Sequence, residues 1–414
     1  MRKTLLSICV LLSMVMAVHA ADYVVTSSKD LGDKVAAAVD GDVIILGQSD
    51  SILSQTALSV SKHIVIKAAA GLSAKPQLKL GIVLKNGSSV SIQGVKFFYD
   101  KPGSGTNSDS KYAISAVTEV AAIDSIVMRD CDISNFGRGV IRADNTTNIA
   151  TIGKVIVDNC VINNASSVSN GYATLGMKTA KVSAITVRNS TFIGGLGAVI
   201  YSEDTTTPLN LSVDHVTIYN CGKTTTKPLI GFKNPAGSKF SVTNSIIYFS
   251  GITTAVSDTM TNRPISFSSA TPDAASFTLN NSIVCSNQFK SKLMSLINPA
   301  SDNAAWATYN TVTVDSVKMD ANYVVTTYPT QLPGLGARGG YKNKQGLQTL
   351  SNSTTIIYTG SEIRLSEPQQ VAVYSVTGNL LLSDKNVTSL SVSKLQKGAY
   401  IVKAGGSVQK FIVR

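Results

Sequence analysis

The sequence contains few aromatic residues and few histidines. Aromatic side chains make up 6% of its 414 residues, with Trp306 as the only tryptophan, and there are three histidines. The chain has no Cys-x-x-Cys string, no Cys/His metal spacing, no HExxH string, no nucleophile elbow and no phosphate-binding loop. These absences exclude the zinc, serine-hydrolase and nucleotide sites that such motifs identify.

Long hydrophobic runs are also scarce. The prominent one opens the chain, where MRKTLLSICVLLSMVMAVHA begins with Arg2 and Lys3, continues with apolar residues and ends in small ones. This pattern is typical of a secretory signal peptide over residues 1–20, cleaved before Ala21. A retained membrane anchor is the alternative, but the apolar run is short for a membrane span. We therefore expect an exported protein.

Acidic residues are outnumbered by basic ones. The chain has 37 lysines and arginines against 25 aspartates and glutamates, a formal net charge of +12. In an exported protein, this excess favours an acidic glycan or another anionic cell-surface polymer as the partner, rather than nucleic acid.

Serine, threonine, asparagine, glycine and valine are abundant, which favours strands and turns over helices. One string recurs, with apolar residues at its first, third and eighth positions and a polar residue at its fifth. The polar positions, 26 to 37 residues apart, are Asp130, Asn159, Asn189, His215, Asn244 and Asn281. Strand-length repeats at variable spacing predict a coil of β-strands, in which each turn buries its apolar face against the next.

Three short strands can be recognised in the repeat that starts at Ile185. Ile185 and Val187 point inward on the first strand, Asn189 forms a sharp bend, the second strand starts at Thr191, and a third covers residues 198–203. Asparagine suits the bend because it tolerates a left-handed backbone, and its amide can bond to the asparagine one turn away. The string therefore recurs because each turn bends at the same place.

Four cysteines remain after the signal peptide, which contains Cys9, is removed; they are Cys131, Cys160, Cys221 and Cys285. Cys131 and Cys160 occupy the same position in successive repeats, where other repeats carry mostly small residues. Disulfides can form in an exported protein, but this position favours buried, unpaired thiols.

The repeated string resembles the right-handed parallel β-helix of the pectin-lyase-like superfamily, whose bends often carry an asparagine ladder. The stretches LGDKVAAAVDGDVIIL, KHIVIKAAAG and GSSVSIQGVKFF are similar to the opening of the chondroitinase B and alginate lyase family. Residues 211–250 also resemble uncharacterised bacterial β-helix domains. The resemblance implies a β-helix over residues 21–340, capped by a short helix near residues 31–39. We expect the segment GLGARGG to close its far end.

The C-terminal part has a different composition. Residues 341–353 are polar and without periodicity, so we expect a linker, and residues 354–414 alternate like the strands of a small β-sandwich. The strings VAVYSVTGNLL, SLSVSKLQKGAYIVKAGG and KFIVR resemble the type A sorting domain of type IX secretion. The resemblance implies recognition at the outer membrane, with release or surface anchoring of the protein. An appended sugar-binding β-sandwich is the alternative.

The third strand of each repeat predicts a charged surface. We place as inward-facing Ile114, Ile141, Leu175, Ile200, Ile230 and Ile265. Three positions further along each strand, an alternating-sign column then faces solvent, formed by Asp144, Lys178, Glu203 and Lys233. Arg142 and Tyr201 flank this column. The residues form either a polysaccharide site or a ladder of ion pairs that stabilises the sheet.

A catalytic role for this surface is implied only by the family resemblance. In the chondroitinase B and alginate lyase family, a lysine acts as base, an arginine as acid, and calcium holds the substrate carboxylate. Lys178 matches the place of that lysine, but Tyr201 stands where the arginine is expected, and no acidic cluster for calcium is evident. If the protein is a lyase, Lys178 and Tyr201 are its catalytic candidates and calcium its candidate cofactor. A neighbouring cation would then have to lower the pKa of Tyr201.

Three hypotheses follow. We favour a monomeric, secreted or cell-surface β-helix protein that binds an acidic polysaccharide without catalysis, through Arg142, Asp144, Glu203 and Lys233. The second hypothesis is a polysaccharide lyase that cleaves a uronate-containing glycan by β-elimination. The third is a structural, adhesin-like surface protein. In each case, residues 354–414 would engage the type IX secretion machinery.

Overall fold

The computed structural model describes the following residues: 20–55, 57–100, 111–143, 145–168, 171–222, 228–249, 265–267, 277–280, 282–286, 318–319, 325–327, 336–337, 356–358, 361–375, 379–404 and 407–413. The chain forms two compact units, Met1–Gly340 and Tyr341–Arg414. Residues 1–19 of the predicted signal peptide, the predicted linker over residues 341–353, Asp144, Asn281 and Trp306 lie outside the described residues.

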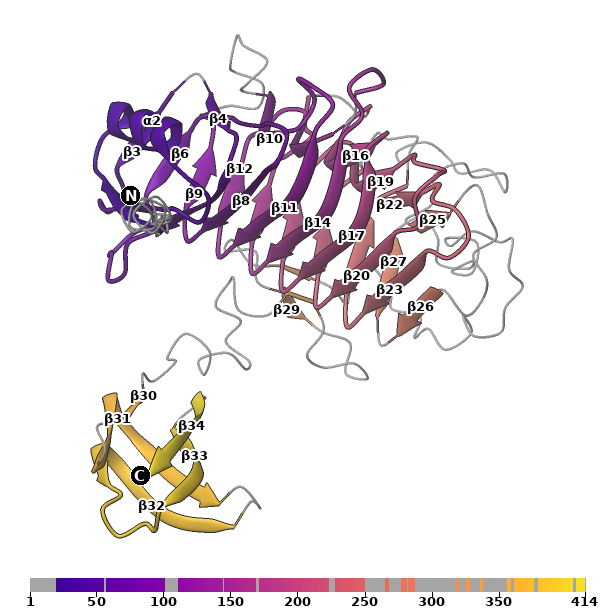
Figure 1. The fold of residues 1–414 in the computed structure, drawn as a ribbon. Coiled ribbons are helices and arrows are strands. Elements are labelled where there is room, and N and C mark those ends of the chain that lie inside the picture. Colours follow the sequence, from indigo (N-terminus) through magenta and orange to yellow (C-terminus); the bar gives the residue numbers. More distant parts are fainter. Residues whose placement is uncertain are drawn as a thin grey trace, which may run out of the picture. The chain divides into compact units, whose positions relative to one another are not determined.

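Three parallel sheets form the first unit (Figure 1). Sheet A contains β1 (Asp22–Val25), β2 (Val43–Leu46), β5 (His63–Ala68), β8 (Ser88–Gln93), β11 (Ala122–Arg129), β14 (Thr151–Asp158), β17 (Lys181–Arg188), β20 (Asn210–Asp214), β23 (Lys239–Thr243) and β26 (Phe277–Asn280). Sheet B contains β3 (Ile52–Ser54), β6 (Gln77–Lys79), β9 (Lys96–Phe98), β12 (Asp132–Ser134), β15 (Val161–Asn163), β18 (Thr191–Ile193), β21 (Thr217–Tyr219), β24 (Ile246–Phe249) and β27 (Ile283–Ser286). Sheet C contains β4 (Leu58–Val60), β7 (Ile82–Leu84), β10 (Tyr112–Ser115), β13 (Gly139–Arg142), β16 (Ala173–Lys178), β19 (Ala198–Ser202), β22 (Ile230–Phe232) and β25 (Ile265–Phe267).

Each turn of the coil contributes one strand to each sheet, so the unit is a parallel β-helix, as the sequence predicts. Neighbouring turns are in register, and the inward positions predicted for sheet C pair with one another as Ile114, Ile141, Leu175, Ile200, Ile230 and Ile265. All of these side chains are buried. Stacked aliphatic side chains therefore form a continuous core along the coil.

The recurring polar residue lies at the bend between sheets A and B. Its backbone φ is positive, between 50° and 54°, at Asp130, Asn159, Asn189, His215 and Asn244. The side chains bond between turns, but not always to one another: the amide of Asn244 donates to Asp214 Oδ1 at 2.8 Å. A second left-handed bend follows sheet B, where the Asn164 amide donates to Asn135 Oδ1 at 3.0 Å. Both bends satisfy polar groups that the turn would otherwise leave unpaired.

Helix α2 (Ser28–Ala37) caps the N-terminal end of the coil (Figure 1). The Ser27 hydroxyl accepts a hydrogen bond from the Asp30 amide at 3.1 Å, which caps the first turn of the helix. Leu31 and Val35 are buried, and the helix packs against β1, β2, β3 and β4. The predicted capping helix is therefore confirmed. Among the described residues, no helix is long and apolar enough to cross a membrane.

The segment predicted to close the far end lies elsewhere. Gly336 donates its amide to the carbonyl of Asn244 at 2.8 Å, and Ala337 donates to Thr217 Oγ1 at 2.9 Å. These contacts place the two residues beside the outer face of sheet B. The prediction of an end cap was wrong for these residues, because the chain returns along the side of the coil. Two short strands, β28 (Lys318–Met319) and β29 (Val325–Thr327), precede them.

The second unit is antiparallel. Its strands are β30 (Ile356–Tyr358), β31 (Glu362–Ser375), β32 (Leu380–Ser391), β33 (Gly398–Ala404) and β34 (Ser407–Val413). The buried side chains include Ile363, Val371, Val373, Val402 and Phe411. This unit has its own hydrophobic core.

The side chains of Cys131 and Cys160 are free and buried, and that of Cys221 is also buried. Burial raises the pKa of the Cys160 thiol well above its usual range, so the thiol keeps its proton. The side chain of Cys285 lies outside the described residues.

Candidate functional site

The outer face of sheet C carries the predicted site. Alternation along β10, β13, β16, β19 and β22 places one residue of each strand on the outer face next to the inward isoleucine or leucine. In register, these residues are Ser115, Arg142, Gly176, Tyr201 and Gly231. The predicted register of this row is confirmed.

A gap interrupts this row at Gly176. A Cβ atom added there would meet only the carbonyl oxygens of Ile141 and Ala173 and the Cβ of Ala173, at 3.4 Å or more. Strands are about 4.8 Å apart, so Arg142 and Tyr201, one strand away on either side, are separated by two such spacings. We call this position the Gly176 gap; its floor is backbone.

Arg142 and Tyr201 both turn away from the Gly176 gap. The Arg142 guanidinium lies 5.0 Å from the centre of the Tyr112 ring, on the strand beyond β13. On the other side, a Cβ at Gly231 would lie 2.9 Å from the Tyr201 ring, so this ring covers β22. The side chains on both sides of Gly176 therefore lean away from it.

A second cation–aromatic pair lies at the start of the same strands. The Arg138 guanidinium is 4.8 Å from the centre of the Tyr172 ring. The rings of Tyr172 and Tyr112 meet edge to face, with 6.4 Å between their centres. The two tyrosines thus hold two guanidinium groups beside each other. Tyr112 is itself buried, so its ring serves as support rather than as an open stacking surface.

Glu203 lies at the centre of the charged group at the other end of the strands. Its carboxylate is 3.9 Å from the Lys178 ammonium and 3.7 Å from the Lys233 ammonium. It also accepts a hydrogen bond of 2.9 Å from the Tyr201 hydroxyl. The structure therefore brings Lys178, Tyr201, Glu203 and Lys233 together, and two cations flank one anion. Asp144, the remaining member of the predicted column, is outside the described residues.

The backbone around Lys178 explains how this contact forms. The register shifts between Gly176 and Lys178, so that Lys178 pairs with Ser202 rather than Glu203, and its φ is 31°. The Lys178 carbonyl accepts a hydrogen bond from the Glu203 amide at 2.7 Å. This irregularity, which the simple alternation did not predict, ends β16, and Glu203 still lies between the two lysines, as the alternation predicts.

Tyr201 does not have the acid–base property that catalysis was expected to require. Burial raises the pKa of its phenol strongly, and the hydrogen bond and negative charge of Glu203 raise it further. The condition that a neighbouring cation lowers this pKa is not met, because the hydroxyl donates a hydrogen bond to the Glu203 carboxylate. At neutral pH the phenol holds its proton, so it is not available as a base, and its raised pKa makes it a weak acid.

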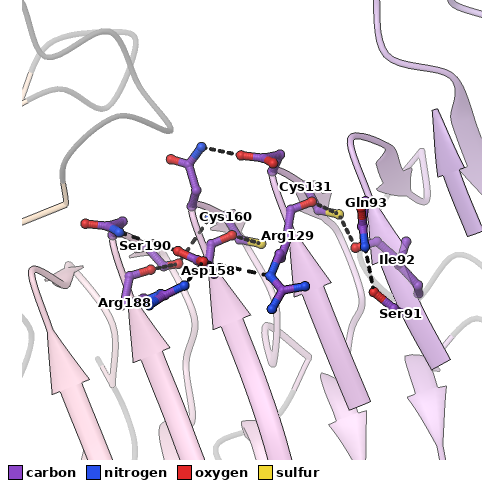
Figure 2. A network of polar contacts seen from close by, with 12 residues as sticks. Ser91, Ile92, Gln93, Arg129, Cys131, Asp158, Cys160, Arg188 and Ser190 are labelled. Atoms are coloured by element: carbon purple, nitrogen blue, oxygen red, sulfur yellow. Dashed lines mark hydrogen bonds and ion pairs between the residues drawn. The ribbon is translucent and has the colours of Figure 1, made fainter. Parts of the chain in front are cut away.

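A second charged group, which the sequence reasoning missed, lies on sheet A (Figure 2). Asp158 is 2.7 Å from the Arg188 guanidinium and 3.9 Å from that of Arg129, on the two neighbouring strands. The signal was present, since Arg129, Asp158 and Arg188 hold the same position before the bend in successive repeats. Partly exposed pairs of this kind contribute up to about 1 kcal/mol each. The group therefore fits a stabilising ion ladder.

Sheet A also carries a shallow hollow of about 270 Å³. It is lined by Ala184, Thr186, Asn210, Leu211, Ser212, Lys239, Phe240, Ser241 and Thr278. Lys239 is the one charged residue of this lining, and the Phe240 side chain is buried. The hollow has hydroxyl and amide groups but little of the positive charge found around the Gly176 gap.

Metal ligands do not gather in the part of the chain that the structure describes. There, no three histidine, cysteine, aspartate or glutamate side chains are close enough to hold a metal ion together. His215 occupies the left-handed bend position, and its Nδ1 lies 2.8 Å from Asp214 Oδ2. His215 therefore has a structural role at the bend, where the repeat predicts a polar residue.

No protein-family model matches the sequence, and no curated protein matches it. Among solved structures, the chain is similar to the PL6 family alginate lyase AlyGC, with 16% sequence identity and a TM-score of 0.39. The match covers 64% of this chain and 37% of the lyase chain, so this protein spans little more than a third of that enzyme's length.

Proposed function

We propose that the protein is an exported binder of an acidic polysaccharide, which lies across the strands on the outer face of sheet C. The observation that carries the proposal is the Gly176 gap, which has a backbone floor and is bordered by Arg142, Tyr201 and the group of Lys178, Glu203 and Lys233. A uronate ring in the gap would have guanidinium and ammonium donors within reach on both sides.

Binding without catalysis is the favoured form of this proposal. The raised pKa of Tyr201 makes its phenol a weak acid in the place where the resemblance implies an arginine, and the Lys178 ammonium lies 3.9 Å from the Glu203 carboxylate. Tyr201 is therefore poorly suited to the proton transfers of β-elimination. The lyase alternative is tested by absorbance near 232 nm on incubation with alginate, pectate or chondroitin sulfate, with and without calcium. We expect no increase; a sustained increase would establish the lyase instead.

Filling the Gly176 gap should abolish most of the binding. Gly176→Gln adds a side chain where a Cβ meets only ordinary contacts, so the fold should tolerate it. We expect the affinity for the bound polymer to fall tenfold or more, as measured by affinity electrophoresis or calorimetry.

Ser212→Gln is the matched control, because Ser212 faces outward in the hollow of sheet A. The control should bind like the parent. If Ser212→Gln loses binding and Gly176→Gln does not, the glycan lies on sheet A and the proposed site is wrong. If the parent retains no acidic glycan, the structural, adhesin-like alternative replaces the proposal.

We further propose that the C-terminal unit directs export through the type IX machinery. Each unit has its own hydrophobic core, so deleting residues 354–414 should leave the β-helix folded. In its host, the truncated protein should accumulate in the periplasm, as measured by fractionation, while it retains the circular dichroism of a β-rich protein. Normal delivery of the truncated protein to the surface or medium would contradict the sorting role.

A further inference from the structure

Asp42 is a fully buried carboxylate at the N-terminal end of the coil. None of its surface is exposed to solvent. Its Oδ1 accepts a hydrogen bond of 2.8 Å from the backbone nitrogen of Ala21, and its Oδ2 accepts one of 2.8 Å from that of Val39. The side chain thus joins the residue before β1 to the segment that leads from α2 into β2.

The charge of Asp42 lacks a basic side chain to balance it. In the part of the chain that the structure describes, no lysine, arginine or histidine side chain forms an ion pair with it. Burying a carboxylate without a cation is costly, and two neutral amide donors offset only part of that cost. The site is therefore electrostatically incomplete when Ala21 is an ordinary peptide unit.

The backbone holds Ala21 in place independently of Asp42. Its carbonyl accepts a hydrogen bond of 2.9 Å from the Val43 amide, and the next residue, Asp22, pairs with Val43 in sheet A. Ala20, which precedes it, is exposed. The nitrogen of Ala21 consequently stays at Asp42 whatever is attached to it.

We infer that Asp42 is a built-in receptor for the N-terminus that signal-peptide removal creates. Hydrolysis of the Ala20–Ala21 peptide bond consumes one water and leaves a carboxylate on Ala20 and a protonated amine on Ala21. That ammonium group pairs with Asp42 and completes the buried charge. The inference rests on the proposed export. It implies that removal of the signal peptide stabilises the first strand and the helical cap.

A thermodynamic cycle on four proteins tests the inference. Two of the proteins begin at Ala21 and are produced by cutting a fusion directly before this residue. The other two are extended by Gly-Ser ahead of Ala20. In each pair, one protein keeps Asp42 and the other carries Asp42→Asn. The extended chain keeps the 2.8 Å hydrogen bond as an amide and lacks only the charge at that nitrogen. With Asp42 present, we expect the extension to raise the unfolding equilibrium constant tenfold or more in urea titrations. With Asp42→Asn, the extension should have little effect.

Equal effects of the extension in both backgrounds would overturn the inference and make Asp42 an ordinary turn residue. If Asp42→Asn does not fold, the two chains with Asp42 decide the matter, since equal stabilities contradict the ion pair. N-terminal sequencing of the exported protein should give Ala21 first, and any other start also overturns it. Polysaccharide binding, measured on the same proteins, reports separately on the proposed function.

Discussion

Replacing Gly139 by alanine is expected to destabilise the β-helix by about 3–5 kcal/mol. Gly139 opens β13 with a φ of 148°, and a Cβ there would lie 2.2 Å from the Ala173 carbonyl oxygen on β16. The oxygen belongs to the backbone of β16, and the Cβ would be fixed to the backbone of β13, so neither can move without disturbing the pairing of the two strands. The measurement is the urea midpoint of unfolding, followed by circular dichroism.

Gly176→Ala is the matched control for that prediction. It makes the same chemical change one strand away, but its Cβ meets nothing closer than 3.4 Å. We expect its free energy of unfolding, obtained from the same titration, to lie within about 1 kcal/mol of that of the parent. Similar midpoints for the two variants would show that β13 and β16 do not approach each other as the structure has them.

Removing both lysines beside Glu203 is expected to lower the affinity for the acidic polymer about a hundredfold at low salt. Lys178→Ala with Lys233→Ala deletes two positive charges and leaves the Glu203 carboxylate without its flanking cations, where it repels a uronate. The difference should shrink as salt rises, because both ammonium groups are partly exposed and are screened. Affinity electrophoresis at several salt concentrations measures both effects.

The control for the lysine pair removes the same charge from another sheet. Lys154 and Lys181 are exposed on strands β14 and β17 of sheet A. Lys154→Ala with Lys181→Ala should change the affinity only slightly. Equal losses in the two double variants would mean that net charge, rather than the site, attracts the polymer.

The fold could be predicted from the sequence because the repeated string fixes both periodicity and bends. An apolar residue at every second position leaves each strand one inward face, and residues such as Asn159 and Asn189 accept the positive φ that the bend requires. The repeat does not determine the conformation of the segments between the strands. The return of Gly336 along sheet B depends on contacts that no local pattern encodes.

The candidate site could be predicted in part, since alternation placed Arg142 and Tyr201 in one row, and Lys178 with Glu203 beside it. The direction of the Tyr201 pKa could not be predicted, because it depends on the burial of the phenol and on its hydrogen bond to Glu203, two residues further on. The Gly176 gap was also missed. A glycine adds no side chain to a sequence pattern. Whether the space above it is free depends on the directions that the neighbouring side chains take.

A crystal structure with a bound uronate oligosaccharide tests the central claim most directly. The account predicts electron density for a sugar ring over Gly176, with its carboxylate within hydrogen-bond distance of Arg142 or of the lysines beside Glu203. Density in the hollow of sheet A, around Ser212 and Lys239, or an empty outer face of sheet C in crystals of a protein that binds the oligosaccharide in solution, would contradict it.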